Sequence, residues 1–200
     1  MKYPEQHKQE VGRRLRRQAA AQIRGKGMDA ISVKSVMAAE GMTVGGFYAH
    51  FDSRKDLLVE ALQSAFSDSK NSFYRHIEQL PVEQWMPTML KLYLSEFHRD
   101  NIENSCPLSS LVGDVARQDE SVKRVFQDGM QRMVDHYAGK LSGLDAEQHR
   151  QLALGLVSLM IGGIQLARAV ADPDYSKQIL EGCIASAERL IETTVEPASR

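Results

Sequence analysis

The sequence predicts an all-α protein of about nine helices, and three observations support this fold class. Apolar residues recur at three- and four-residue spacing along most of the 200 residues, which is the period of an amphipathic helix. Glycine and proline separate these segments at intervals typical of helices. No segment combines strict alternation of apolar and polar residues with the β-branched residues that strands favour.

The composition indicates a globular protein, with 42% hydrophobic and 26% charged residues. The two cysteines, Cys106 and Cys183, are too few for a disulfide framework and lack zinc-type spacing. We therefore expect no metal or other cofactor, and a reducing compartment such as the cytoplasm. The N-terminal segment lacks the apolar core of a signal peptide. We interpret the uncharged segment 151–167 as a buried helix, because it is short for a bilayer span, and expect a soluble protein with no membrane partner.

Charge is distributed unevenly along the chain. Residues 1–56 contain 11 Lys and Arg against 6 Asp and Glu, whereas residues 57–200 contain 14 against 20. A basic first domain followed by an acidic remainder suggests a polyanion that binds only the first part, although solvated charge blocks are also common. We place the predicted domain boundary between residues 56 and 57.

The helical segments follow from periodicity and from stop signals such as Gly25-Lys26-Gly27, Gly41, Pro81 and Ser142-Gly143. Pro107 fits the first position of a helix. The fifth segment carries Trp85 to Phe97, with Pro87 expected in its first turn. The predicted helices cover about 5–24, 33–40, 44–50, 53–79, 85–97, 107–115, 122–141, 145–171 and 175–194.

Two short helices, 33–40 and 44–50, are joined by the glycine-containing turn Glu40–Thr43, which is the length a helix-turn-helix needs. The second helix is too short to be stable alone. It contains Gly45 and Gly46, and each glycine costs about 1 kcal/mol relative to alanine in a helix. Those glycines make sense if the backbone must approach another surface closely, as in the major groove of DNA.

The segment 31–57 resembles the DNA-binding domain of the TetR (tetracycline repressor) family. The matching residues are Gly27, Gly41, Tyr48, Phe51, Arg54 and Leu57. Arg54 stands where the family usually has lysine, Met28 where an aromatic residue is common, and Ile23 where phenylalanine is frequent. The charge and the apolar character are kept at these positions, but the geometry of an arginine differs from that of a lysine.

The resemblance implies a set of DNA contacts. Phosphate contacts are expected from Ser32, Lys34, Thr43, Tyr48, His50 and Arg54. Contacts to base edges are expected from Val44, Gly45 and Gly46, with Lys55 as a weaker neighbour. The basic run Arg13, Arg14, Arg16 and Arg17 is a further source of phosphate or minor-groove contacts. Phe51 is expected in the core.

The resemblance also implies a homodimer with a four-helix interface built from the last two helices. The alternative for these apolar helices is burial within the same subunit, and the sequence leaves it open. The predicted dimer residues are Leu152, Leu156, Leu159, Gly163, Leu166, Ile184 and Leu190.

Aromatic, methionine and cysteine side chains of the middle helices form a candidate pocket for a small apolar or aromatic effector. Such stripes are also common in ordinary cores. The predicted pocket residues are Trp85, Met89, Tyr93, Phe97, Cys106, Met133 and Tyr137. Cys106 precedes Pro107 at a helix start, where the helix dipole favours a reactive thiolate, so a redox or electrophile sensor remains an alternative.

No enzyme motif occurs, and the six histidines are dispersed. We therefore predict a transcription regulator and no catalytic residues: a repressor that binds a palindromic double-stranded DNA operator as a homodimer and is released by a ligand. The alternatives are a helical protein-interaction module and a small helical enzyme without DNA binding.

Overall fold

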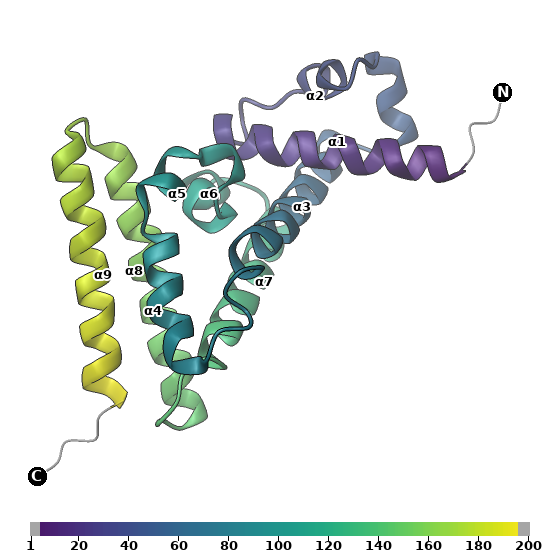
Figure 1. Ribbon diagram of the computed structural model, residues 1–200. Coiled ribbons are helices and arrows are strands. Elements are labelled where there is room, and N and C mark those ends of the chain that lie inside the picture. The colour runs from purple at the N-terminus through teal and green to yellow at the C-terminus, as the bar shows by residue number, and fades with distance from the viewer. Residues whose placement is uncertain (1–4, 196–200) are drawn as a thin grey trace, which may run out of the picture. The chain divides into compact units, whose positions relative to one another are not determined.

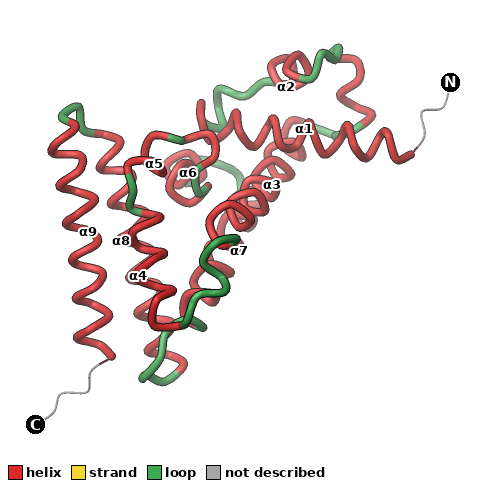
Figure 2. The backbone as a smooth tube through the Cα atoms, in the orientation of Figure 1, coloured by secondary structure: helices red, strands yellow, loops and turns green. Residues whose placement is uncertain are grey.

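The computed structural model describes residues 5–195, with side chains described for residues 6–69 and 74–194 (Figures 1 and 2). The ends of both predicted domains, residues 1–4 and 196–200, lie outside the described residues. Within the described range every regular element is a helix, which confirms the all-α prediction. The elements are α1 (Glu5–Lys26), α2 (Val33–Ala39), η1 (Val44–Ala49, a 3₁₀ helix), α3 (Arg54–Tyr74), α4 (Val82–Tyr93), α5 (Glu96–Asp100), η2 (Ile102–Asn104, also 3₁₀), α6 (Pro107–Val115), α7 (Glu120–Ala138), α8 (Ala146–Ala169) and α9 (Pro173–Val195).

The chain divides into two compact units, and the division differs from the predicted boundary at residue 56. The first unit contains residues up to Ser69 together with Ile102–Gln127, and the second contains Lys70–Asn101 and the residues from Asp128 onward. The boundaries therefore fall inside α3 and α7. A cut at residue 56 would divide α3 near its start and would remove α6 from the core it helps to form.

One hydrophobic core holds the first unit together. The predicted stripe of α1 (Val11, Leu15, Ala19 and Ile23) is buried. It belongs to the same core as Leu57, Leu58, Ala61 and Leu62 of α3, and Leu111 and Val115 of α6. Because a helix as short as α2 is marginal by itself, this shared core supplies most of its stability.

Polar contacts fix the C-terminal end of α1 to η2 and α6. The buried Arg24 guanidinium donates to the carbonyl oxygens of Ala65, at 3.3 Å, and Glu103, at 2.5 Å. The backbone N–H of Met28 donates to Asp114 Oδ2 at 3.0 Å. Gly27 has φ of +84°, and a Cβ there would lie 2.8 Å from the same oxygen. Glycine is required here both for the left-handed conformation and for space.

In the second unit, α8 and α9 run antiparallel and side by side (Figures 1 and 2). A Cβ on Gly163 would lie 2.7 Å from Cys183 Sγ and 3.1 Å from Leu94 Cδ2, so glycine allows this close packing. Among the described residues, α8 alone is long and apolar enough to cross a membrane, and 44% of its most apolar window is buried inside the protein. Its length and composition are weak evidence for a membrane span, because core helices have the same properties.

The predicted fifth helix is interrupted. It forms α4 up to Tyr93 and then the short α5, and Pro87 lies in the second turn of α4. Ser95 explains the break, because its hydroxyl accepts the His98 N–H at 3.1 Å and donates to the Leu92 carbonyl at 2.8 Å. This N-cap starts a new helix and leaves Phe97 74% exposed.

A buried histidine and two arginines hold α5 against α4, α8 and α9. His98 Nδ1 lies 2.6 Å from the Tyr93 carbonyl oxygen, so the neutral ring donates from Nδ1, and its ring contacts the Tyr93 ring edge-on. Arg168 of α8 donates to the carbonyls of His98 and Arg99, both at 2.9 Å. The Arg99 guanidinium in turn donates to Ser176 Oγ of α9 at 2.9 Å. Burial lowers the pKa of His98 to about 4, and the nearby Arg168 charge acts in the same direction.

This histidine makes stability depend on pH. The folded state binds fewer protons than the unfolded state between the unfolded pKa of about 6.5 and the folded pKa of about 4. The contribution of neutral His98 is complete above pH 6.5 and is lost as the pH falls through 4. We expect a loss of about 3 kcal/mol from this group, measured by urea unfolding at several pH values. His98→Gln should flatten the profile, whereas His76→Gln, at an exposed site, should not; parallel profiles for all three proteins would contradict the assignment.

Candidate nucleic-acid interface

The helix-turn-helix is formed by α2, the turn at Glu40–Thr43 and η1. Ser32 and Ser35 cap α2 reciprocally: Ser32 Oγ accepts the Ser35 N–H at 3.0 Å, and Ser35 Oγ accepts the Ser32 N–H at 3.1 Å. Gly41 has φ of +67°, which permits the tight turn. The predicted α-helix at 44–50 is instead a 3₁₀ helix that ends at Ala49.

Two aromatic side chains hold η1 on the unit. Phe47 is fully buried and Phe51 nearly so, and their rings stack with centroids 5.3 Å apart. The expectation that Phe51 belongs to the core is confirmed. Phe47 is not among the predicted core residues, although its four-residue spacing from Phe51 is a signal for the same buried side. Burial of this pair compensates for the weak helix propensity of a segment with two glycines.

The two glycines of η1 serve different purposes. A Cβ on Gly45 would meet only Thr43 Oγ1, at 3.9 Å, so this position faces open space. A Cβ on Gly46 would lie 3.4 Å from Met37 Cε and 3.6 Å from Met42 Cε. Gly46 therefore allows η1 to pack against α2, and only Gly45 keeps the predicted role of close approach to another surface.

The outer side of η1 is exposed. Tyr48 is 74% exposed and Val44 is 48% exposed, although both are large and apolar or aromatic. Thr43 occupies the N-cap position, but its side chain makes no capping hydrogen bond. Lys34 is exposed on α2. The two helix N-termini carry Thr43, Val44 and Lys34 together with the Ser32 hydroxyl, and the helix dipole favours a negatively charged partner there. Tyr48 lies in the last turn of η1.

His50 follows η1 and is half-buried. Its Nδ1 lies 3.5 Å from the position of a Cβ on Gly12, so the ring packs against α1. Burial lowers the pKa of His50, and the charges of Lys8 and Arg16 lower it further. His50 is therefore neutral at pH 7 and would meet a phosphate as an N–H donor rather than as a charge.

Arg54 makes its contacts within the protein. Its guanidinium donates to the Met28 carbonyl at 2.9 Å and to the Ile31 carbonyl at 3.3 Å. It thereby ties the loop between α1 and α2 to the start of α3, and its predicted phosphate contact stays a prediction. Lys55 is exposed and lies 3.5 Å from Asp119.

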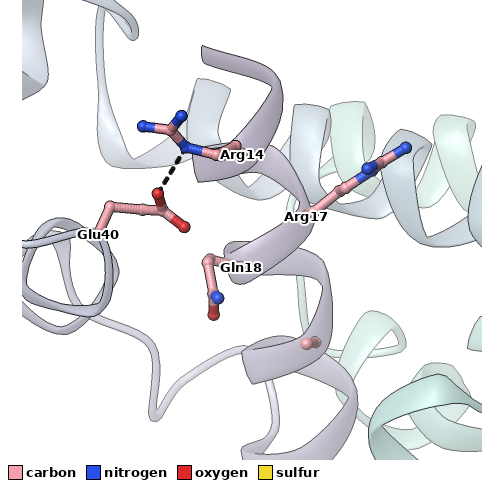
Figure 3. Close-up of a pocket in the computed structure, with 5 residues that line it drawn as sticks. Arg14, Arg17, Gln18 and Glu40 are labelled. Carbon is pink, nitrogen blue, oxygen red and sulfur yellow. Dashed lines mark hydrogen bonds and ion pairs between the residues drawn. The ribbon is translucent and has the colours of Figure 1, made fainter. Parts of the chain in front are cut away.

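The basic run on α1 is largely paired within the unit. Arg14 bonds Glu40 at 2.8 Å, Arg16 bonds Glu60 at 2.5 Å, and Arg17 lies 3.9 Å from Asp68. Figure 3 shows Arg14 and Arg17 with Gln18 and Glu40 around an open pocket of about 220 Å³. These pairs connect α1 to α2 and α3, so the run acts mainly within the protein. Arg13 is exposed and makes no ion pair with a described residue.

The predicted effector residues do not all lie in one unit. Trp85, Met89, Tyr93, Met133 and Tyr137 are buried in the second unit. Phe97 is on the surface, because the helix breaks at Ser95, and this corrects its assignment to a pocket. Cys106 lies in the first unit, whereas the other predicted pocket residues lie in the second. It is the N-cap of α6 and only 4% exposed, which disfavours attack by a bulky electrophile.

The predicted dimer residues separate by burial. Leu152, Leu156 and Gly163 are buried within the subunit and offer no surface to a partner, which corrects the prediction for these three. Leu159 and Ile184 are half-buried, whereas Leu166 is 60% and Leu190 42% exposed.

The exposed side of the helix pair is apolar and rich in small residues. A Cβ added to any of its three glycines would meet no atom within 4 Å. We call this surface the α8–α9 face; it contains Leu154, Gly155, Gly162, Leu166, Tyr175, Gly182 and Leu190.

These features define a class of protein: a DNA-binding regulator with a helix-turn-helix head and a helical second domain. Residues 15–61 match the sequence model of bacterial regulatory proteins of the tetR family. Residues 81–180 match the C-terminal domain of LmrA/YxaF-like transcriptional regulators. The chain belongs to the TetR family of transcriptional regulators. It is accordingly a regulator and not an enzyme.

Solved structures share the fold at low sequence identity. A TetR transcriptional regulator from Legionella pneumophila is 23% identical, with 89% of this chain and 95% of that chain covered and a TM-score of 0.74. One from Chloroflexus aurantiacus is 20% identical, with coverage of 94% and 96% and a TM-score of 0.77. The reduced form of E. coli NemR is 16% identical, with coverage of 94% and 99% and a TM-score of 0.76. No curated protein sequence matches this chain.

The carbonyl contacts of Arg54 predict a difference between two adjacent cationic positions. Arg54→Lys should lower the free energy of unfolding by about 1 to 2 kcal/mol, because lysine loses the Nε donor to Ile31 and places its single ammonium group differently from the guanidinium. Lys55→Arg should change it by less than about 0.5 kcal/mol, because its ion pair is exposed. Urea unfolding of both variants measures the difference, and equal effects would refute the structural role of Arg54.

Proposed function

We propose that this regulator is a repressor that reads a palindromic operator as a homodimer and leaves it when a small ligand binds the second unit. The exposed N-terminal ends of α2 and η1 carry the proposal for DNA. The side chains of Ser32, Lys34 and Thr43 contact phosphates there, and those of Tyr48, in the last turn of η1, and His50, just after η1, contact further phosphates. Val44 contacts a thymine methyl group, and Gly45 allows the backbone to approach the base edges.

The α8–α9 face supports the homodimer. Exposed leucines beside glycines with open space at their Cβ positions suit a second pair of helices at close approach. A second copy also supplies a second helix-turn-helix. Two are needed because helix-turn-helix dimers bind half-sites about one DNA turn, ~34–36 Å, apart. The acidic second part of the chain disfavours DNA contact outside the heads.

The aromatic residues of the second unit support effector binding. Trp85 and Tyr137 meet edge to face with centroids 5.3 Å apart, and Met89 and Met133 are buried in the same unit. A ligand that binds one spacing of the two heads more tightly than the other shifts the dimer toward that spacing and so changes operator affinity. Because the operator is chromosomal DNA, we place this activity in the cytoplasm.

Tyr48 provides the most direct test of the DNA face. An operator is first selected from a random duplex library by the purified full-length protein. Tyr48→Ala should then weaken binding at least tenfold in fluorescence anisotropy at fixed salt, and Tyr48→Phe should give the part of this loss due to the hydroxyl group. Phe97→Ala is the matched control, since Phe97 is equally exposed but lies outside the head. Unchanged affinity of Tyr48→Ala would exclude its contact.

Dimerisation is tested at a glycine of the α8–α9 face. Gly162→Glu should give monomers in sedimentation velocity at micromolar concentration, because a charged side chain enters a closely packed apolar contact. Gly113→Glu is the control, because Gly113 is an exposed helical glycine of α6 with no atom within 4 Å of its Cβ position. A Gly162→Glu protein that remains dimeric would place the interface elsewhere.

A further inference from the structure

A cluster of donors in the second unit surrounds one carboxylate. Lys140 Nζ donates to Glu78 Oε1 at 2.9 Å, and His136 Nε2 lies 3.4 Å from Glu78 Oε2. The Lys140 hydrogen bond lowers the pKa of Glu78. The charge of His136 and the indole N–H of Trp85 contribute further. Three donors from α4, α7 and the residues just after α7 therefore converge on a single anion.

The donors are more buried than the group they hold. The side chains of Lys140 and His136 are 19% and 27% exposed, whereas that of Glu78 is 47% exposed. Trp85 is fully buried, and its Nε1–H acts on the Glu78 carboxylate without reaching good hydrogen-bond geometry. A buried donor with a poorly formed hydrogen bond costs free energy that a better-placed acceptor would recover.

Glu78 is held less firmly than its donors. It lies in the turn between α3 and α4, whereas Trp85 and His136 lie inside α4 and α7. If the turn moves outward, the carboxylate regains water at little cost, because exposed ion pairs contribute little to stability. The Lys140 ammonium, the His136 ring and the indole N–H would then remain together without the carboxylate.

Aromatic rings form the wall beside these donors. The Tyr74 ring lies 4.7 Å from the His136 ring and 6.0 Å from the Trp85 ring, and Lys140 Nζ lies 5.3 Å from the centroid of Trp85. Tyr74 and His136 are both half-buried, so parts of both side chains remain accessible to a planar ligand. The site therefore combines cationic donors with aromatic surface.

We propose that this cluster is a binding site for aromatic carboxylates, in which Glu78 occupies the anion position until a ligand replaces it. The ligand carboxylate accepts from Lys140, His136 and the Trp85 N–H, and its ring packs beside Tyr74. The inference rests on the proposed effector function of the second unit and names the chemical class of the effector.

Trp85 is the only tryptophan of the chain, so its fluorescence reports binding directly. The probe is benzoate, titrated into the full-length protein without DNA, with benzamide as its uncharged counterpart. The Glu78→Ala variant lacks the carboxylate that competes with the ligand for the same donors. Its affinity for benzoate should therefore be about tenfold or more above that of the native protein. Glu83→Ala, an exposed acidic residue of α4, is the matched control and should leave the affinity unchanged.

Lys140→Met keeps the aliphatic stem but removes the charge, and in the Glu78→Ala background it should abolish benzoate binding. Lys91→Met is its control on an exposed lysine of α4, and circular dichroism melting verifies folding of every variant. Equal affinity for benzoate and benzamide, or no binding by Glu78→Ala, would overturn the inference.

Release from DNA is measured separately, by adding benzoate to the operator complex. Benzoate binding with no change in operator affinity would leave the site intact and reject its role in release. A protein that binds operator and responds to other ligands, but whose Glu78→Ala variant ignores benzoate, would retain the regulator function and reject the site.

Discussion

The DNA-reading segment depends on burial of Phe47. A 3₁₀ helix of six residues with two glycines has no stability of its own, so its position is set by what it buries. Phe47 stacks on Phe51 and fixes η1 on the core, which leaves Val44 and Tyr48 pointing outward. Gly46 completes the contact with α2, and Gly45 keeps the outer side clear. The exposed surface is thus a consequence of the inner packing.

Arginine has mainly a structural function in the first unit. Arg24 donates to the carbonyls of Ala65 in α3 and Glu103 in η2, and Arg54 donates to carbonyls of the loop between α1 and α2. Arg14 and Arg16 pair with Glu40, just after α2, and Glu60 of α3. The planar guanidinium of Arg54 donates through Nη2 to both loop carbonyls and through Nε to one of them, and a lysine lacks this second nitrogen. A basic run in sequence therefore overstates the charge available to DNA, because partners from distant segments neutralise much of it.

The second unit separates two kinds of apolar residue on the same helix. Leu156 and Gly163 of α8 are buried within the subunit, and Gly163 packs against Cys183 of α9 and Leu94, whereas Leu166 is exposed and Gly162 faces open space. The buried and the exposed residues of α8 are of the same types and lie close together in the sequence, so the sequence does not distinguish them. Membership of the TetR family adds the expectation of a dimer, and the exposed set shows which part of α8 remains for a partner.

The sequence alone determined the helical class, the helix-turn-helix and the family resemblance, because periodicity, Gly41 and the spacing of Tyr48, Phe51 and Leu57 are local features. It did not determine the break at Ser95, the inward direction of Gly46 or the carbonyl contacts of Arg54. It also could not bring Glu78 to Lys140 and Trp85. Most of these features depend on contacts between residues that lie far apart in the chain. The break at Ser95 depends on whether a helix continues or a new N-cap forms. In both cases tertiary packing decides the outcome.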